Sequence, residues 1–166
     1  MRFLLTTTFL MMCLAATASP YCRDIDHAEA RYVVCSFDPK MSDIRVYDRD
    51  YASGEVYGSF ANLSSALWTQ HQFTVFAMNG GMYHRDLSPV GLLVEHGQER
   101  ATISTRSGWG NFHLLPNGVF FIDGKKAGVM ETAKYLQSGM KVDFATQSGP
   151  MLMIDGKVHP DRKSVV

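Results

Sequence analysis

The residues best suited to chemistry lie in one short stretch, residues 79–89, which reads Asn-Gly-Gly-Met-Tyr-His-Arg-Asp-Leu-Ser-Pro. It follows an apolar run, residues 73–78, that predicts a buried strand. The two glycines would let the backbone leave that strand through conformations closed to other residues, and they keep backbone N–H groups uncovered. A strand that ends in such a polar turn is a candidate ligand site, and a plain polar loop between two strands is the alternative.

A second polar, glycine-bearing segment, Gln147-Ser148-Gly149-Pro150, comes later in the chain. Like the first segment, it follows one predicted strand, residues 142–146, and precedes another, residues 151–154. Loops at the same end of adjacent strands face one another, so we expect the two segments to form opposite walls of a cleft.

The spacing of residues excludes several other chemistries. Ser148 has no Gly-x-Ser-x-Gly context, and the six histidines include no His-Glu-x-x-His pair. The stretch Gly108-Trp109-Gly110 lacks the third glycine of a dinucleotide-binding loop. We therefore expect a site without metal or cofactor.

The elements that must position these segments are mostly strands. Residues 31–37 and 44–47 are rich in β-branched and aromatic side chains, and they predict two strands joined by a turn. Residues 60–68 carry apolar side chains at helical spacing after Ser59, which predicts a capped amphipathic helix packed on a sheet.

From Gly91 onward the sequence predicts successive hairpins and one more short helix. The hairpins join residues 91–95 to 100–104, 112–115 to 119–122, and 119–122 to 126–129, with turns at His96-Gly97, Pro116-Asn117-Gly118 and Asp123-Gly124. The helix covers residues 132–137 and ends at Ser138-Gly139. The expected fold class is α+β: a β-rich single domain of twisted sheet and successive hairpins with two short helices.

Composition fits one globular domain without a charged partner. The chain has 166 residues, of which 46% are hydrophobic and 19% charged, enough for a modest core. Sixteen basic and sixteen acidic residues give zero formal net charge, so nothing favours nucleic-acid binding or electrostatic attachment to a membrane.

The N-terminus predicts export. Arg2 precedes an apolar stretch, residues 3–16, and Ala16-Thr17-Ala18 is a small-x-small cleavage site. We expect a signal peptide at residues 1–18 and a periplasmic or secreted domain at residues 19–166, with no membrane contact after cleavage.

Because we expect the protein to be exported, its cysteines are candidates for a disulfide. Cys13 leaves with the signal peptide, so Cys22 and Cys35 are the pair left in an oxidising compartment. A disulfide between them is expected, and two unpaired thiols are the alternative.

Four motifs in chain order resemble the phosphodiester glycosidase domain family. They are Asn-Gly-Gly-Met-Tyr at residues 79–83, Ser-Pro-Val-Gly-Leu at 88–92, Asn-Phe-His at 111–113 and Thr-Gln-Ser-Gly-Pro-Met-Leu at 146–152. The resemblance runs from about Arg31 to His159, and that family includes the N-acetylglucosamine-1-phosphodiester α-N-acetylglucosaminidase that uncovers mannose 6-phosphate. Many bacterial relatives are exported, and some are labelled exopolysaccharide-related. The resemblance implies hydrolysis of a sugar-1-phosphodiester at the anomeric C–O bond.

This reaction sets the expected roles of the site residues. A phosphate leaves readily as an anion, so the site needs positive potential near the phosphate and a carboxylate or activated water near the anomeric carbon. Asp86 is the candidate base or electrostatic stabiliser because it is the only carboxylate of the first segment, and a turn-capping aspartate is its alternative. Asn79 is grouped with it as a residue on which turnover depends.

The remaining residues of the two segments are expected to bind a phosphorylated sugar or polysaccharide through backbone N–H groups, amides, a hydroxyl and positive charge. These substrate-binding candidates are Gly80, Gly81, Tyr83, His84, Arg85, Gln147, Ser148 and Gly149. Trp109 and His113 either line the same cleft or pack in a surface loop.

Domains of the resembled family continue beyond the second polar segment into stretches with an arginine and an Asp-Gly-Gly loop. This sequence stops at Val166, so we expect a C-terminal truncation and a second carboxylate outside it. The expected function is an exported hydrolase linked to exopolysaccharide or cell-envelope glycan metabolism. The alternative is a non-catalytic glycan- or exopolysaccharide-binding domain on the same scaffold.

Overall fold

The computed structural model describes residues 21–159. The chain divides into two compact units, one up to Asp38 and one from Pro39 onward. The predicted signal peptide and the last residues of the predicted domain lie outside the described residues. Among residues 21–159, no helix has the length and apolar character needed to cross a membrane.

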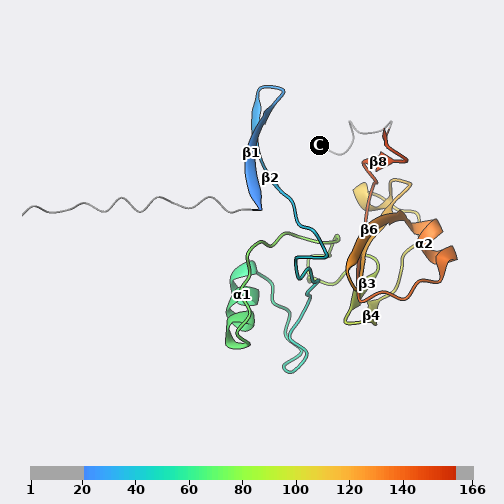
Figure 1. The fold of residues 1–166 in the computed structure, drawn as a ribbon. Helices are drawn as coiled ribbons and strands as arrows, with labels where there is room; N and C mark the ends of the chain where they lie inside the picture. The colour runs from blue at the N-terminus through green and yellow to red at the C-terminus, as the bar shows by residue number, and fades with distance from the viewer. Residues whose placement is uncertain (1–20, 160–166) are drawn as a thin grey trace, which may run out of the picture. The chain divides into compact units, whose positions relative to one another are not determined.

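The first unit is an antiparallel hairpin of β1 (Cys22–His27) and β2 (Ala30–Cys35), drawn in blue in Figure 1. A disulfide joins Cys22 to Cys35, as predicted. The predicted pairing of residues 31–37 with residues 44–47 is wrong, because β2 pairs with β1 and residues 44–47 form no strand. The turn between β1 and β2 has positive φ at Ala28 (47°) and Glu29 (65°), two residue types that give no hairpin signal.

The second unit is built on a five-stranded antiparallel sheet with the strand order β4-β3-β7-β5-β6. Figure 1 labels β3, β4 and β6 of this sheet. Its strands are β3 (Leu93–Glu95), β4 (Gln98–Ala101), β5 (Gly118–Asp123), β6 (Lys126–Glu131) and β7 (Phe144–Ser148). The hairpins that turn at His96-Gly97 and after Asp123 are confirmed. A short hairpin of β8 (Met153–Ile154) and β9 (Lys157–Val158) follows the sheet.

The core of this unit lies between the sheet and α2 (Thr132–Ser138). Tyr135 of α2 packs among apolar side chains of the strands and neighbouring loops: Leu92, Val94, Val119, Val142 and Ala145. The helix ends at Gly139, which adopts the left-handed conformation with a φ of 62°, as the sequence predicts.

The other helix, α1 (Phe60–Thr69), is also confirmed, together with its cap. Ser59 Oγ accepts a hydrogen bond from the Asn62 backbone N–H at 3.1 Å. Leu67 is the only buried residue of the helix, while Phe60 and Trp68 are exposed. The predicted packing face of α1 is therefore reduced to Leu67 and the half-buried Leu63.

Two further predicted strands are absent from the described residues. Residues 73–78 form no strand, and Phe73, Val75 and Met78 are 66%, 67% and 71% exposed. Residues 112–115 begin instead in a 3-10 turn, η1 (Asn111–His113). Its geometry is fixed by the buried Asn117, whose side chain donates to the Phe112 carbonyl at 3.1 Å. Apolar runs this short do not reveal whether a partner strand is available, which is why both predictions failed.

The predicted α+β, β-rich class is confirmed, with two helices and three antiparallel sheets in the described residues. The strand leading into the second polar segment is shifted. β7 begins at Phe144 and includes Gln147 and Ser148, so the predicted break starts only at Gly149.

Candidate functional site

A pocket of about 580 Å³ lies where β7 ends at Ser148. Three separate parts of the chain line it: the first polar segment with the adjoining Val90, residues 109–113 around η1, and Ser148, the last residue of β7. The lining residues are Asn79, Gly80, Gly81, Met82, Tyr83, His84, Val90, Trp109, Gly110, Asn111, Phe112, His113 and Ser148.

The first polar segment lies directly against β7. A Cβ atom added to Gly81 would sit 2.3 Å from Thr146 Oγ1 and 2.7 Å from the Gln147 carbonyl oxygen, so no larger residue fits there. The expectation that Gly80 and Gly81 provide unusual backbone conformations is wrong, because neither has a positive φ. The absence of a side chain at these two glycines lets the backbone lie close to β7.

The expected arrangement of the cleft changes accordingly. The two polar segments are in contact at Gly81 and Gln147, and Ser148 lines the pocket together with residues 79–84. Apart from Val90, the rest of the pocket lining comes from residues 109–113, of which the sequence left Trp109 and His113 open between cleft and surface loop.

Residues 82–90 form a loop closed by backbone hydrogen bonds. Val90 N–H donates to the Met82 carbonyl at 3.0 Å, and His84 N–H donates to the Ser88 carbonyl at 2.8 Å. Tyr83 and His84 lie near the closed base of this loop and line the pocket, whereas Arg85 and Asp86 lie at its tip and are not among the lining residues.

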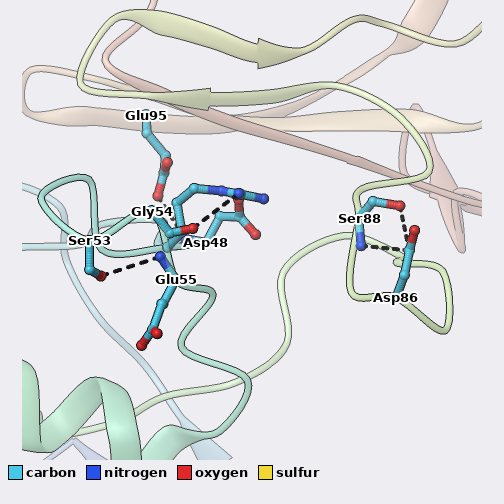
Figure 2. A network of polar contacts seen from close by, with 8 residues as sticks. Asp48, Ser53, Gly54, Glu55, Asp86, Ser88 and Glu95 are labelled. Atoms are coloured by element: carbon cyan, nitrogen blue, oxygen red, sulfur yellow. Dashed lines mark hydrogen bonds and ion pairs between the residues drawn. The ribbon is translucent and has the colours of Figure 1, made fainter.

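Asp86 is held in the turn by its own neighbour. Its carboxylate accepts hydrogen bonds from the Ser88 hydroxyl at 2.6 Å and from the Ser88 backbone N–H at 3.0 Å (Figure 2). These bonds hold the pKa of the exposed Asp86 carboxyl below its usual value. The contacts are those of a turn-capping aspartate, the alternative that the sequence left open.

Gln147 is part of the core. Its side chain is 1% exposed, and its Oε1 accepts hydrogen bonds from the backbone N–H groups of Leu92 (3.1 Å) and Ser104 (2.9 Å). Its Nε2 donates to the Ser104 carbonyl at 2.8 Å and to Thr132 Oγ1 at 3.2 Å. With its amide so occupied, Gln147 shapes the pocket by holding β7 and is not among the lining residues.

The last residues of the second polar segment have different surroundings. Ser148 lines the pocket. Gly149 lies against the η1 region instead, where an added Cβ would be 2.6 Å from the Phe112 carbonyl oxygen. Of the ten predicted catalytic or substrate-binding residues, the pocket therefore brings together Asn79, Gly80, Gly81, Tyr83, His84 and Ser148.

The pocket also contains Trp109 and His113, whose place in the cleft the sequence left open, and Asn111, to which it gave no role. Trp109 is 99% exposed, and Asn111 and His113 come from the Asn-Phe-His motif. That motif was the available signal, but Phe112 and His113 were also expected to lie in a strand at residues 112–115. Of the described residues, no Asp or Glu lines the pocket.

A carboxyl group with a very different environment lies elsewhere on the sheet. Glu95 of β3 is 1% exposed, and its Oε1 accepts a hydrogen bond from the Asp48 backbone N–H at 2.7 Å (Figure 2). Its Oε2 has no hydrogen-bond partner among the described residues. Burial raises the pKa of Glu95 to about 7.

A second, smaller hollow of about 290 Å³ has a lining that includes Asp43, Arg45, Lys125 and Asp143. Arg45 is bound to Asp43 through two hydrogen bonds of 2.9 and 2.7 Å, and Asp143 accepts from the Gly124 N–H. Three of the four charged side chains of this hollow thus already make hydrogen bonds within the protein. Within residues 21–159, no three His, Cys, Asp or Glu side chains cluster as metal ligands would.

Comparison with known proteins identifies the class to which this site belongs. The model of the phosphodiester glycosidase family matches residues 72–165, a range that includes every lining residue of the pocket. The chain belongs to this family, which confirms the resemblance seen in its motifs.

One relative is the uncharacterized protein YigE of Escherichia coli (strain K12), which is 36% identical over 123 residues. The match covers 74% of this chain and 47% of YigE, so the chain spans about half the length of this relative. No solved structure matches the chain.

Proposed function

We propose that the protein hydrolyses a sugar-1-phosphodiester by splitting the bond between the anomeric carbon and the phosphate oxygen. The observation that carries the proposal is the pocket of about 580 Å³, because residues of the family motifs meet there from three separate parts of the chain. The pocket combines aromatic rings, amides, imidazoles and a hydroxyl, which are the groups that a phosphorylated sugar needs.

The sugar is held by aromatic and amide side chains. Trp109 and Tyr83 are 99% and 53% exposed, so each offers an uncovered ring on which the apolar face of a sugar can stack. Asn79 and Asn111 carry both a donor and an acceptor, which suits vicinal hydroxyl groups.

The phosphate is held by neutral donors and by His84. The backbone of Gly80 and Gly81 is free of side chains, and the Ser148 hydroxyl makes no hydrogen bond within the described residues. His84 adds a donor that is cationic when protonated. Because a phosphate departs as a stabilised anion, this set suffices without a strong general acid.

The proposed setting is outside the cytoplasm, acting on exopolysaccharide or cell-envelope glycans. The predicted signal peptide at residues 1–18 supports it. So does the Cys22–Cys35 disulfide, since disulfides persist in oxidising compartments.

The test is turnover by the full-length protein. Methyl phosphodiesters of N-acetylglucosamine, glucose, galactose and mannose 1-phosphates are incubated with it, and free sugar and methyl phosphate are quantified by NMR. Release of both products from at least one diester is expected. No release from any of the four, at enzyme concentrations that would detect one turnover per hour, would refute the proposal.

A specific observation favours a second candidate, a non-catalytic glycan-binding domain. Of the described residues, no carboxylate lines the pocket, and Asp86 is engaged with Ser88. Binding of the four diesters, measured by calorimetry, without product release would establish this alternative.

A further inference from the structure

We infer that His113 is the proton acceptor of the pocket, with its Nε2 atom taking a proton from the attacking water. The inference rests on the proposed function and deepens it. Four observations carry it: the position of His113 in the pocket lining, the partner of its Nδ1, the free Nε2 and the packing of its ring.

The hydrogen bond of the ring decides which nitrogen carries the proton. His113 Nδ1 lies 2.9 Å from the Arg106 backbone carbonyl oxygen. A carbonyl oxygen only accepts hydrogen bonds, so Nδ1 must be the donor. In the neutral ring, Nε2 is then unprotonated and presents a lone pair.

The other ring nitrogen is unoccupied. Within residues 21–159, His113 Nε2 makes no hydrogen bond, while the half-buried ring lines the pocket. An acceptor fixed by a backbone carbonyl and left open on its other side has the geometry of an oriented general base.

The ring is held in place on two sides. A Cβ added to Gly108 would lie 2.7 Å from both Cδ2 and Nε2 of His113, so the backbone at Gly108 packs against the ring. The Phe112 ring meets it edge-on, with centroids 5.1 Å apart and an interplanar angle of 80°. These contacts limit rotation of the imidazole and preserve the direction of its lone pair.

The proposed step is the attack of a water molecule on the anomeric carbon. A water oxygen forms a bond to the anomeric carbon while the bond from that carbon to the phosphate oxygen breaks, and the electron pair leaves with the phosphate monoester. The water proton passes to His113 Nε2 and then to solvent, which restores the neutral ring.

Competing groups in the pocket fit this role less well. The other titratable side chains among the described lining residues are Tyr83 and His84. Both belong to the closed loop of residues 82–90, and no hydrogen bond to the His84 ring fixes one tautomer within the described residues. Of the pocket histidines, His113 is the one with an assigned acceptor atom.

A pair of variants in the full-length protein separates the two nitrogens. In His113→Asn, the amide NH₂ occupies roughly the Nδ1 position and can still donate to Arg106, but the acceptor at Nε2 is gone. In His113→Gln, the amide reaches the Nε2 position but cannot accept a proton at neutral pH. With the best methyl phosphodiester as substrate, we expect kcat to fall by about 10²-fold or more in both, while KM stays within about threefold.

The pH profile of kcat should change with the variants. The wild type should show an acid-side limb in its pH profile of kcat, and this limb should vanish in both variants. The matched control is His96→Asn, outside the pocket lining and at a positive φ (48°) that Asn tolerates. Its kcat and acid limb should match the wild type.

A spectroscopic readout tests the tautomer without any substrate. In a long-range ¹H–¹⁵N spectrum of isotope-labelled wild-type protein, with ring signals assigned by backbone-to-side-chain correlations, the neutral His113 should show a protonated Nδ1. A protonated Nε2 would overturn the inference even if the variants fail to fold.

The kinetic outcomes separate the inference from the proposed function. Wild-type turnover that persists within threefold in His113→Asn overturns the role of His113 and leaves the proposed function standing. No wild-type turnover on any of the four diesters overturns both.

Discussion

Asp86 and Glu95 carry the same functional group in opposite environments (Figure 2). The Asp86 carboxylate is exposed at a loop tip, where Ser88 donates two hydrogen bonds to it and lowers its pKa. The Glu95 carboxyl is buried on β3 with one hydrogen bond, and its pKa rises to about 7. One carboxyl is stabilised as an anion and the other is stabilised in its protonated form.

The difference shows why a carboxylate cannot be assigned a role from its position in a motif. Asp86 lies within the motif-rich segment, but its hydrogen-bond acceptors are used by the turn. Glu95 lies in an ordinary strand and has the perturbed acidity often associated with functional sites, although it is not among the pocket-lining residues. Desolvation and hydrogen bonding, set by the fold, determine the chemistry of each group.

The largest expected effect concerns Glu95 and pH. Its pKa is about 7 in the folded protein and 4.5 as the ordinary value, so the folded state keeps a proton that the unfolded state releases. The free energy of unfolding should therefore fall as pH rises from about 4.5 through 7, by on the order of 3 kcal/mol. Glu95→Gln cannot ionise and should lose this dependence, as measured by denaturant unfolding at pH 5 and pH 8.

Charged groups near Glu95 also affect its pKa, and a second carboxyl variant serves as the control. The hydrogen bond from the Asp48 backbone N–H lowers the pKa of Glu95, the Asp48 carboxylate raises it, and Arg100 and Arg49 lower it. Glu99→Gln removes an exposed carboxyl from the neighbouring strand β4, and it should keep the wild-type dependence. An equal loss of stability between pH 5 and pH 8 in Glu95→Gln and wild type would show that Glu95 is ionised throughout.

The second prediction compares a residue of the pocket lining, Asn79, with a residue at the tip of the loop of residues 82–90, Asp86. Asn79→Ala removes an amide that lines the pocket, so turnover of the best methyl phosphodiester should fall by about 10²-fold with the fold intact. Asp86→Ala removes a tip residue outside the lining, and kcat should stay within about threefold. Steady-state kinetics and circular dichroism measure both effects. A loss of about 10²-fold in Asp86→Ala would restore the catalytic role that the sequence suggested for it.

The smallest expected effect concerns Ser88. Ser88→Ala removes the hydroxyl bond that, with the backbone bond, lowers the pKa of Asp86. A carboxyl with a lowered pKa stabilises the fold above its unfolded pKa, and this contribution is lost as pH falls through the folded value. The melting temperature of Ser88→Ala should thus lie slightly below wild type at pH 7, with the difference shrinking at pH 3. A difference that is the same at both pH values would mean that the bond does not favour the charged form.

The parts of the fold that the sequence predicted well depend on local chemistry. The Ser59 cap of α1, Gly139 at the end of α2 and the turn at His96-Gly97 are each encoded within a few residues. The disulfide followed from composition and compartment, because Cys22 and Cys35 were the pair left after the expected signal peptide.

The parts that failed depend on distant partners. Whether residues 73–78 form a strand depends on a neighbour to pair with, and the direction of the Gln147 side chain depends on the donors at Leu92 and Ser104. The pocket shows the same division: the polar segment was visible in the sequence, but its neighbour at residues 109–113 could be placed only after β7 and η1 were folded.

The buried amide of Gln147 has a consequence for how specificity can vary. It joins β7 to the backbone at Leu92 and Ser104 and to the start of α2 at Thr132, so the strand that ends at Ser148 cannot shift without disturbing the core. The pocket thus has a rigid floor, while Trp109 and Tyr83 form an exposed rim. Relatives that act on different sugars should therefore differ mainly at the positions of Trp109 and Tyr83 and should keep the hydrogen bonds of Gln147.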